Sequence, residues 1–146
     1  MKDAAMMRDI RNGLKCLLGA TMLIGLFGAA QSFGAAAPGL TRTNSAGGVT
    51  AKVTYLNPED AAAPRFQVVL DTHSVDLDAF DLKNLSLLRD EAGKTYQPTQ
   101  MENKGGGHHR EVTLAFPKSA SGAKRLELVI KEIAGVKERS FRWELK

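Results

Sequence analysis

The sequence has very little cysteine, and this scarcity excludes several protein classes. The chain holds one Cys among its 146 residues. Cys16 stands in front of an uncharged apolar run, whereas the cysteine of a lipoprotein would follow such a run. A single thiol also excludes a disulfide framework. Beyond the N-terminal segment no thiolate remains as a nucleophile or metal ligand, so packing must stabilise the fold.

Neither sign of charge dominates the composition. The chain carries 20 Lys and Arg against 16 Asp and Glu. Four of the basic and two of the acidic residues lie within residues 1–37, which leaves 16 against 14 and a formal charge of +2. An excess this small predicts no nucleic-acid partner. The length and the 43% hydrophobic content suit one modest domain and exclude a multidomain enzyme.

The N-terminal segment has the parts of a secretory signal. An uncharged run of 14 residues, 17–30, is followed by small residues up to position 37. This run is shorter than the roughly 20 residues that a membrane-spanning helix needs. We therefore expect residues 1–37 to be a cleaved signal peptide, which leaves a periplasmic or secreted protein with no stable membrane span. An uncleaved N-terminal anchor is the alternative. The basic residues in front of the run are Lys2, Arg8, Arg11 and Lys15.

The rest of the chain shows the two-residue period of β-strands. Residues 38–48 are polar and rich in glycine, which predicts a flexible linker. From Val49 onward, apolar and polar residues alternate in short segments, and no long amphipathic helix interrupts them. Residues 49–146 are therefore expected to form an antiparallel, immunoglobulin-like β-sandwich of about seven strands. The expected strands are 49–55, 66–72, 85–89, 95–100, 112–116, 126–130 and 141–145, with Gly93 supplying a positive φ in the hairpin after the third.

Reversal of the chain at each connection would bring three loops to one end of the sandwich. These loops are residues 71–82, 101–110 and 134–138, and they hold every histidine of the protein. Imidazole is the commonest side-chain ligand of zinc and copper. Three glycines before the His108–His109 pair would let both rings turn inward. The sequence therefore predicts a copper or zinc site formed by His73, His108, His109, Met101 and Asp71.

Other interpretations of the same loops remain open or are weaker. His73 would otherwise cap a strand end while His108 and His109 lie in solvent, because no His-x-His spacing is present. The aspartates from Asp71 to Asp81 lack the glycine and closing glutamate of an EF-hand loop. Ser74 lies beside His73 without a Gly-x-Ser-x-Gly elbow, and neighbouring residues do not form a catalytic triad. No enzymatic activity is expected.

Three segments carry a resemblance to known proteins. They are DTHSVDL at 71–77, GGHHR at 106–110 and GVKERSFRW at 135–143. With the strands around them, this chain resembles uncharacterised small exported bacterial proteins with an immunoglobulin-like β-sandwich domain, over about residues 49–146. The resemblance implies the fold and the export, and no activity. Two functions are therefore expected: a non-catalytic module that binds copper or zinc, or a structural or adhesive module that binds another envelope protein.

Overall fold

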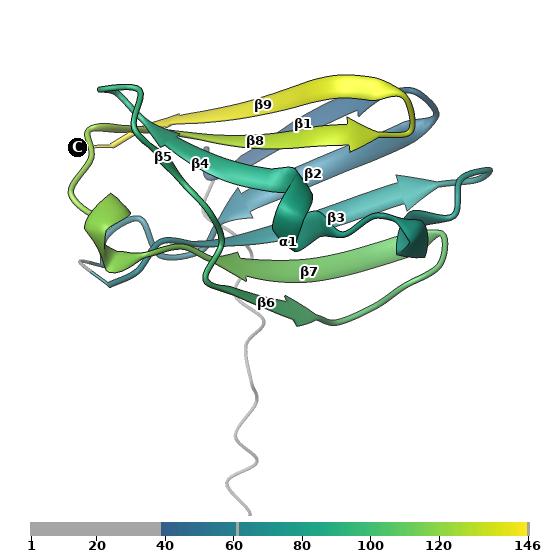
Figure 1. Cartoon of the computed structure of the whole chain (residues 1–146), viewed down its shortest axis with the longest axis horizontal. Coiled ribbons are helices and arrows are strands. Elements are labelled where there is room, and N and C mark those ends of the chain that lie inside the picture. The colour runs from purple at the N-terminus through teal and green to yellow at the C-terminus, as the bar shows by residue number, and fades with distance from the viewer. Residues whose placement is uncertain (1–38, 61, 146) are drawn as a thin grey trace, which may run out of the picture. The chain divides into compact units, whose positions relative to one another are not determined.

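A computed structural model describes residues 39–60 and 62–145, so the predicted signal peptide lies outside the described residues. The chain forms two antiparallel sheets that pack face to face (Figure 1). This architecture confirms the predicted all-β sandwich. The five-stranded sheet has the order β1-β2-β3-β7-β6 and the four-stranded sheet the order β5-β4-β8-β9. The strands are β1 (Thr41–Ala46), β2 (Val49–Tyr55), β3 (Arg65–Thr72), β4 (Ser86–Asp90), β5 (Thr95–Tyr96), β6 (Gln100–Asn103), β7 (His109–Ala115), β8 (Arg125–Ile133) and β9 (Val136–Glu144).

Two parts of the secondary structure predicted from the sequence, the linker at 38–48 and the strand at 95–100, are wrong. The segment 38–48 is not a flexible linker, because β1 lies inside it and pairs with β2 from Val49 to Thr54. The strand predicted over 95–100 is instead two strands in different sheets, β5 and β6. Pro98 separates them, and a proline has no N–H with which to continue a ladder. The described chain therefore has nine strands, and it crosses between the sheets three times.

The core lies between the inward faces of the two sheets. Alternate residues along each long strand are buried, as the predicted period of two requires. Four aromatic rings pack together, and the stacked pair of Tyr55 and Phe66 has ring centroids 4.6 Å apart. Trp143 approaches both of these rings, and its Nε1 donates a hydrogen bond of 2.8 Å to the carbonyl oxygen of Leu40. The N-terminal edge of the domain is thereby tied to β9.

The end of the sandwich that carries the histidines is built from hairpins, and we call it the tip. The two-residue turns Gly47–Gly48 and Ala134–Gly135 have positive φ at both positions, as tight hairpins require. The two turns meet, because a Cβ atom on Gly47 would lie only 2.6 Å from the carbonyl oxygen of Ala134. The ladder places Thr72 beside Val49 and His109 beside Asp71. The predicted convergence of the three loops is confirmed, and the β1–β2 turn joins them.

Two short helical segments close the gap between the sheets after β3. They are η1 (Leu77–Ala79) and α1 (Leu82–Leu85), and they bury Leu77 and Leu82 in the core. Arg110 on β7 fixes this segment, because its Nη1 donates hydrogen bonds of 2.6 Å to the carbonyl oxygens of Leu77 and Phe80. A third short helix, η2 (Lys118–Ala120), precedes β8. Within residues 39–60 and 62–145, no helix combines the length and the apolar character needed to cross a membrane.

Candidate functional site

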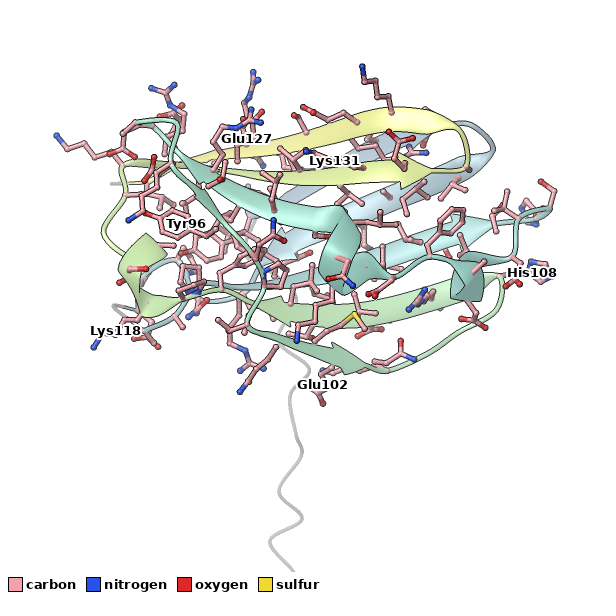
Figure 2. All side chains as sticks on the ribbon, in the orientation of Figure 1. Tyr96, Glu102, His108, Lys118, Glu127 and Lys131 are labelled. Atoms are coloured by element: carbon pink, nitrogen blue, oxygen red, sulfur yellow. The ribbon has the colours of Figure 1, made fainter. Side chains whose placement is uncertain are left out.

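All three histidines and Asp71 line one hollow at the tip, which we call the histidine hollow. Asp71 and Thr72 end β3, and His109 begins β7. Gly48 and Thr50 complete the lining from β2 and its turn. Figure 2 shows His108 at this end of the molecule, in the connection that leads into β7. Residues separated by more than 30 positions in the sequence are thus brought into one small surface region.

The histidine hollow contains a carboxylate–imidazole pair that is already hydrogen-bonded. Asp71 and His109 are direct partners in the antiparallel ladder, so their side chains project from the same outer face of the sheet. A carboxylate oxygen of Asp71 is hydrogen-bonded to Nδ1 of His109. An ionised carboxylate only accepts, so the proton of this bond lies on Nδ1, and in a neutral imidazole Nε2 is then the nitrogen with a free lone pair. The His109 side chain is 66% exposed and can be reached from solvent.

Backbone hydrogen bonds hold the two other histidines beside this pair. The Thr72 N–H donates to the carbonyl oxygen of His108 over 3.0 Å. The Thr72 hydroxyl donates to the carbonyl oxygen of Gly48 over 2.8 Å and accepts from the Ser74 N–H over 3.3 Å. The backbone is therefore fixed on both sides of Thr72, while the side chains of His73 and His108 are exposed. These two rings can rotate without disturbing the core.

The glycine run before the histidines fits closely against Asp78, a contact that the sequence did not reveal. The Gly107 N–H donates to Oδ2 of Asp78 over 2.9 Å. A Cβ atom on Gly106 would lie 2.8 Å from Oδ1 of Asp78, so a side chain at this position would require the carboxylate to move. Gly107 itself has a φ of 73°. The glycines thus let the loop close over η1, and they set the path by which His108 reaches the hollow.

The neighbouring aspartates serve the turns in which they lie. Asp76 accepts a hydrogen bond of 3.0 Å from the Asp78 N–H and caps η1. Asp81 accepts from the N–H groups of Lys83 and Asn84 and caps α1. Each carboxylate is thus engaged by backbone within its own turn. This local role explains the acidic composition of the segment.

The predicted contribution of Met101 to the histidine site is wrong. Met101 lies in β6 rather than in a loop, and it pairs with Leu114, whose side chain is fully buried. Its parity in the ladder turns the thioether toward the core, against which it packs partly buried. Met101 lines a different hollow, along β6. The sequence signal that would have shown this is the alternation of Met101 with Gln100 and Glu102.

The described residues hold no group of three His, Cys, Asp or Glu side chains already arranged around a metal position. The preformed element is the Asp71–His109 pair, and His73 and His108 surround it as exposed rings on the same hollow. Chemically, this arrangement offers up to three imidazole nitrogens and one orienting carboxylate. Comparison of the chain with protein-family models, with curated proteins and with solved structures found no match.

Proposed function

We propose that this protein is an exported, non-catalytic binding module of the immunoglobulin-like type, whose histidine hollow binds copper or zinc. The observation that carries the proposal is the Asp71–His109 pair inside a hollow that His73 and His108 also line. The exported location rests on the N-terminal sequence pattern. Two of the resemblance segments, 71–77 and 106–110, supply the three histidines and Asp71 of the hollow.

The pairing of Asp71 with His109 suits a metal-binding imidazole. Histidines that bind metals commonly donate their second ring N–H to a carboxylate, which fixes the ring and raises the basicity of the other nitrogen. Here Nδ1 is held by Asp71, so Nε2 is the nitrogen that would bind the ion. Asp71 is accordingly assigned to positioning rather than to direct coordination. His73 and His108 would supply two further nitrogens, and a water would complete the coordination.

The ion would assemble part of its own site. His73 and His108 are exposed, so binding must restrict two rings that are otherwise free to change rotamer. This ordering cost lowers the affinity relative to a preformed three-histidine centre. The backbone contributes little to the cost, because hydrogen bonds to Thr72 already fix both segments. We therefore expect one specific site and a measurable increase in stability on binding.

The first test is titration of the purified protein with Cu(II) and Zn(II) at about pH 7, where unperturbed histidine is mostly neutral. Joint shifts of the three histidine ring NMR signals with Zn(II), complete at one equivalent, are the expected result, and Cu(II) should broaden the same signals. Independent or weak responses of the rings would overturn the proposal. That outcome would favour the structural or adhesive module that binds another envelope protein.

A variant separates the positioning role of Asp71 from simple charge attraction. Asp71→Asn should weaken metal affinity roughly 10- to 100-fold, as loss of such outer carboxylates does elsewhere. His109→Asn should abolish the joint response of the remaining rings. Glu59→Gln serves as the control, because Glu59 is an exposed carboxylate in the β2–β3 loop, outside the lining of the hollow. Equal affinity in Asp71→Asn and Glu59→Gln would show that Asp71 does not position the ring.

A further inference from the structure

A second hollow lies over the outer face of the five-stranded sheet and shares no lining residue with the histidine hollow. We call it the outer hollow. It is lined mainly by Arg65 on β3, by Thr113 and Ala115 on β7, and by Gln100 and Glu102 on β6, where Figure 2 labels Glu102. Its volume of about 760 Å³ lies within the range of roughly 300–1,000 Å³ that is common for small-molecule sites.

The strand register determines the shape of the outer hollow. Arg65, Ala115 and Gln100 form one row across β3, β7 and β6, with the short side chain of Ala115 in the middle. Glu102 stands beside Thr113 in the next row on the same face. Because neighbouring strands are about 4.8 Å apart, the backbones of Arg65 and Gln100 are separated by roughly 10 Å. The β7 strand therefore forms the floor, and side chains of β3 and β6 form the walls.

Most polar side chains elsewhere on this face are hydrogen-bonded to one another. Four bonded pairs join neighbouring strands: Thr41 with Thr54, Ser45 with Thr50, Gln67 with Glu111, and Asp71 with His109. The outer hollow differs, because Arg65, Gln100 and Glu102 are exposed and make no side-chain hydrogen bond or ion pair with the described residues. The polar groups of its walls are thus available to an external ligand.

The floor of the outer hollow contains a buried polar group without a partner. Thr113 is 3% exposed, and its hydroxyl makes no hydrogen bond with the described residues. Most buried hydroxyl groups in folded proteins are hydrogen-bonded, so an external partner would account for this one. Its neighbours on the face are Gln67 and Glu102. Gln67 is held by Glu111 over 2.7 Å, whereas the exposed Glu102 can change rotamer and uncover the hydroxyl.

The chemistry of the lining defines the ligand. Arg65 and Lys83, an exposed residue of α1, are cations that only donate hydrogen bonds. Glu102 is the one carboxylate of the lining and only accepts, which leaves a net charge of +1. One carboxylate on the ligand would balance that charge, and hydroxyl groups beside it would donate to Glu102 and bond to Gln100 and Thr113. Among the described residues of the lining there is no aromatic ring on which a neutral sugar could stack.

We propose that the outer hollow binds a sugar acid, which is a small polyhydroxylated carboxylate such as a uronic acid, either free or as one residue of a polysaccharide. Arg65 would bind the carboxylate, to which a planar guanidinium can donate two hydrogen bonds. Gln100, Glu102 and Thr113 would bind hydroxyl groups of the sugar ring as it lies over Ala115. The proposal is independent of metal binding, because the two hollows share no residue.

Titration of the isotope-labelled protein with glucuronate at pH 7, without added metal, tests the proposal. The backbone amide NMR signals of Gln100, Thr113 and Ala115 should shift together and saturate, while the signal of His109 stays unchanged. Three other compounds are the matched probes: glucose lacks the carboxylate, acetate lacks the hydroxyl groups, and glycine carries an ammonium group in their place. Binding of any of these as tightly as glucuronate, or no saturable shift with glucuronate, would overturn the proposal.

The source of the ligand is determined by comparing glucuronate with a linear trisaccharide of glucuronate residues. Tighter binding of the trisaccharide would identify a polysaccharide as the source. Equal affinities of the residue and the trisaccharide's monomer would identify the free acid. Both results support the proposal, because the carboxylate and its neighbouring hydroxyl groups are common to the two compounds.

Variants of the lining separate this site from general charge attraction. Arg65→Gln should weaken glucuronate binding roughly fivefold through the loss of one exposed ion pair. Ala115→Leu should abolish binding, because the larger side chain fills the space between the walls. Lys52→Gln is the control, since Lys52 is an exposed cation on the same face that does not line the hollow. Equal weakening in Arg65→Gln and Lys52→Gln, or unchanged binding in Ala115→Leu, would refute the assignment.

Thr113→Val tests the buried hydroxyl with little change in side-chain volume. Because that hydroxyl makes no hydrogen bond with the described residues, its removal should leave the midpoint of urea unfolding unchanged or raised. Glucuronate binding should nevertheless weaken several-fold. A stable Thr113→Val protein with unchanged affinity for glucuronate would contradict the placement of the ligand over β7 and overturn the proposal.

Discussion

Arg139 is the residue whose role is least expected from its chemistry. It is 1% exposed and has no carboxylate partner among the described residues, and burial lowers the pKa of its guanidinium. Its donors instead bond to neutral oxygens, at 2.8 Å to Oδ1 of Asn44 and to the carbonyl oxygen of Ala46, and at 3.4 Å to the carbonyl of Val49. One side chain on β9 thus joins both strands of the β1–β2 hairpin to the opposite sheet.

Replacement of Arg139 by methionine should therefore destabilise the protein. The methionine fills much of the volume but leaves the oxygens of the β1–β2 hairpin without donors, which costs roughly 2–4 kcal/mol in total. Urea unfolding followed by circular dichroism would measure the change. Lys137→Met is the control, because Lys137 is exposed on the same strand. An unchanged midpoint in Arg139→Met would mean that the buried charge costs as much as its hydrogen bonds contribute.

Substitution of Glu132 should instead increase the stability of the protein. Its φ is 57°, in the left-handed region that glutamate disfavours, and its side chain is exposed near the tip. Asparagine tolerates this conformation better, so Glu132→Asn should raise the free energy of unfolding by roughly 0.5–1 kcal/mol. The same substitution at Glu138, an exposed position in β9 where no positive φ is found, should give no such gain. Thermal unfolding of the two variants provides the comparison, and equal midpoints would contradict the backbone explanation.

Individual residues differ in how far the sequence revealed them. Gly93 has the predicted positive φ, because a short hairpin loop allows few alternatives. The two-residue period of Phe141 and Trp143 also points to Arg139 as an inward residue. Its charge argued for the surface, and only the hairpin carbonyls explain why it is buried. The pairing of Asp71 with His109 could not be predicted from the sequence, since it depends on the register of β3 against β7.

At the scale of elements, the glycine loop that carries His108 depends on one close approach. Gly106→Ala would place a methyl group 2.8 Å from Asp78, so the carboxylate must move and its bond to the Gly107 N–H must weaken. We expect a loss of about 1–2 kcal/mol in stability. Chemical-shift changes should be confined to η1 and the histidine hollow.

A neighbouring glycine supplies the control for this substitution. A Cβ atom on Gly105 would have its nearest contact at 3.4 Å, with the carbonyl oxygen of His109, which is close to ordinary van der Waals distance. Gly105→Ala should therefore cost much less than Gly106→Ala. Heat denaturation of both variants measures the difference. Equal losses would indicate that backbone entropy, rather than contact with Asp78, determines the need for glycine.

Two features of the strand pattern, β1 and the division between β5 and β6, could not be predicted from the sequence, for different physical reasons. The β1 strand carries polar residues on both faces, since Arg42 and Asn44 bond across to β9 while Thr41 bonds to Thr54 on its own sheet. Such a strand has no hydrophobic period to detect. The break between β5 and β6 at Pro98 was detectable as a proline, but the change of sheet depends on tertiary packing. The long strands with alternating burial were predicted because most residues on their core side are apolar.

For the molecule as a whole, the response to acid is governed partly by Glu127. Burial on β8 alone would raise the pKa of this carboxyl, but hydrogen bonds from Ser140 and Arg142 and the charges of Arg142 and Arg89 outweigh that effect and lower the pKa. A carboxyl with a lowered pKa in the folded state stabilises the protein above its unfolded pKa. This contribution is lost as the pH falls through the folded pKa.

Glu127→Gln should therefore be less stable than the unchanged protein at pH 7, and the difference should shrink as the pH falls below the ordinary glutamate value of about 4.3. Urea unfolding at a series of pH values between 7 and 3 would measure it. Glu59→Gln, which removes an exposed carboxylate, should show no comparable pH-dependent difference. A gap between Glu127→Gln and the unchanged protein that stays constant with pH would show that packing, and not ionisation, determines the effect.

Truncation of the chain can test whether β1 is needed for the domain to fold. A chain beginning at Gly39 retains β1, the Leu40 carbonyl that accepts from Trp143 and the Asn44 and Ala46 oxygens that accept from Arg139. We expect it to unfold cooperatively. A chain beginning at Val49 loses all of these partners, which leaves Arg139 with only its longer bonds to the carbonyl oxygens of Val49 and Ile133 and the Trp143 indole N–H without its acceptor, so it should be largely unfolded at 25 °C. Circular dichroism and gel filtration would distinguish the two chains. Equal stability would mean that β2 alone can close this side of the sandwich, and that β1 adds only a covering strand.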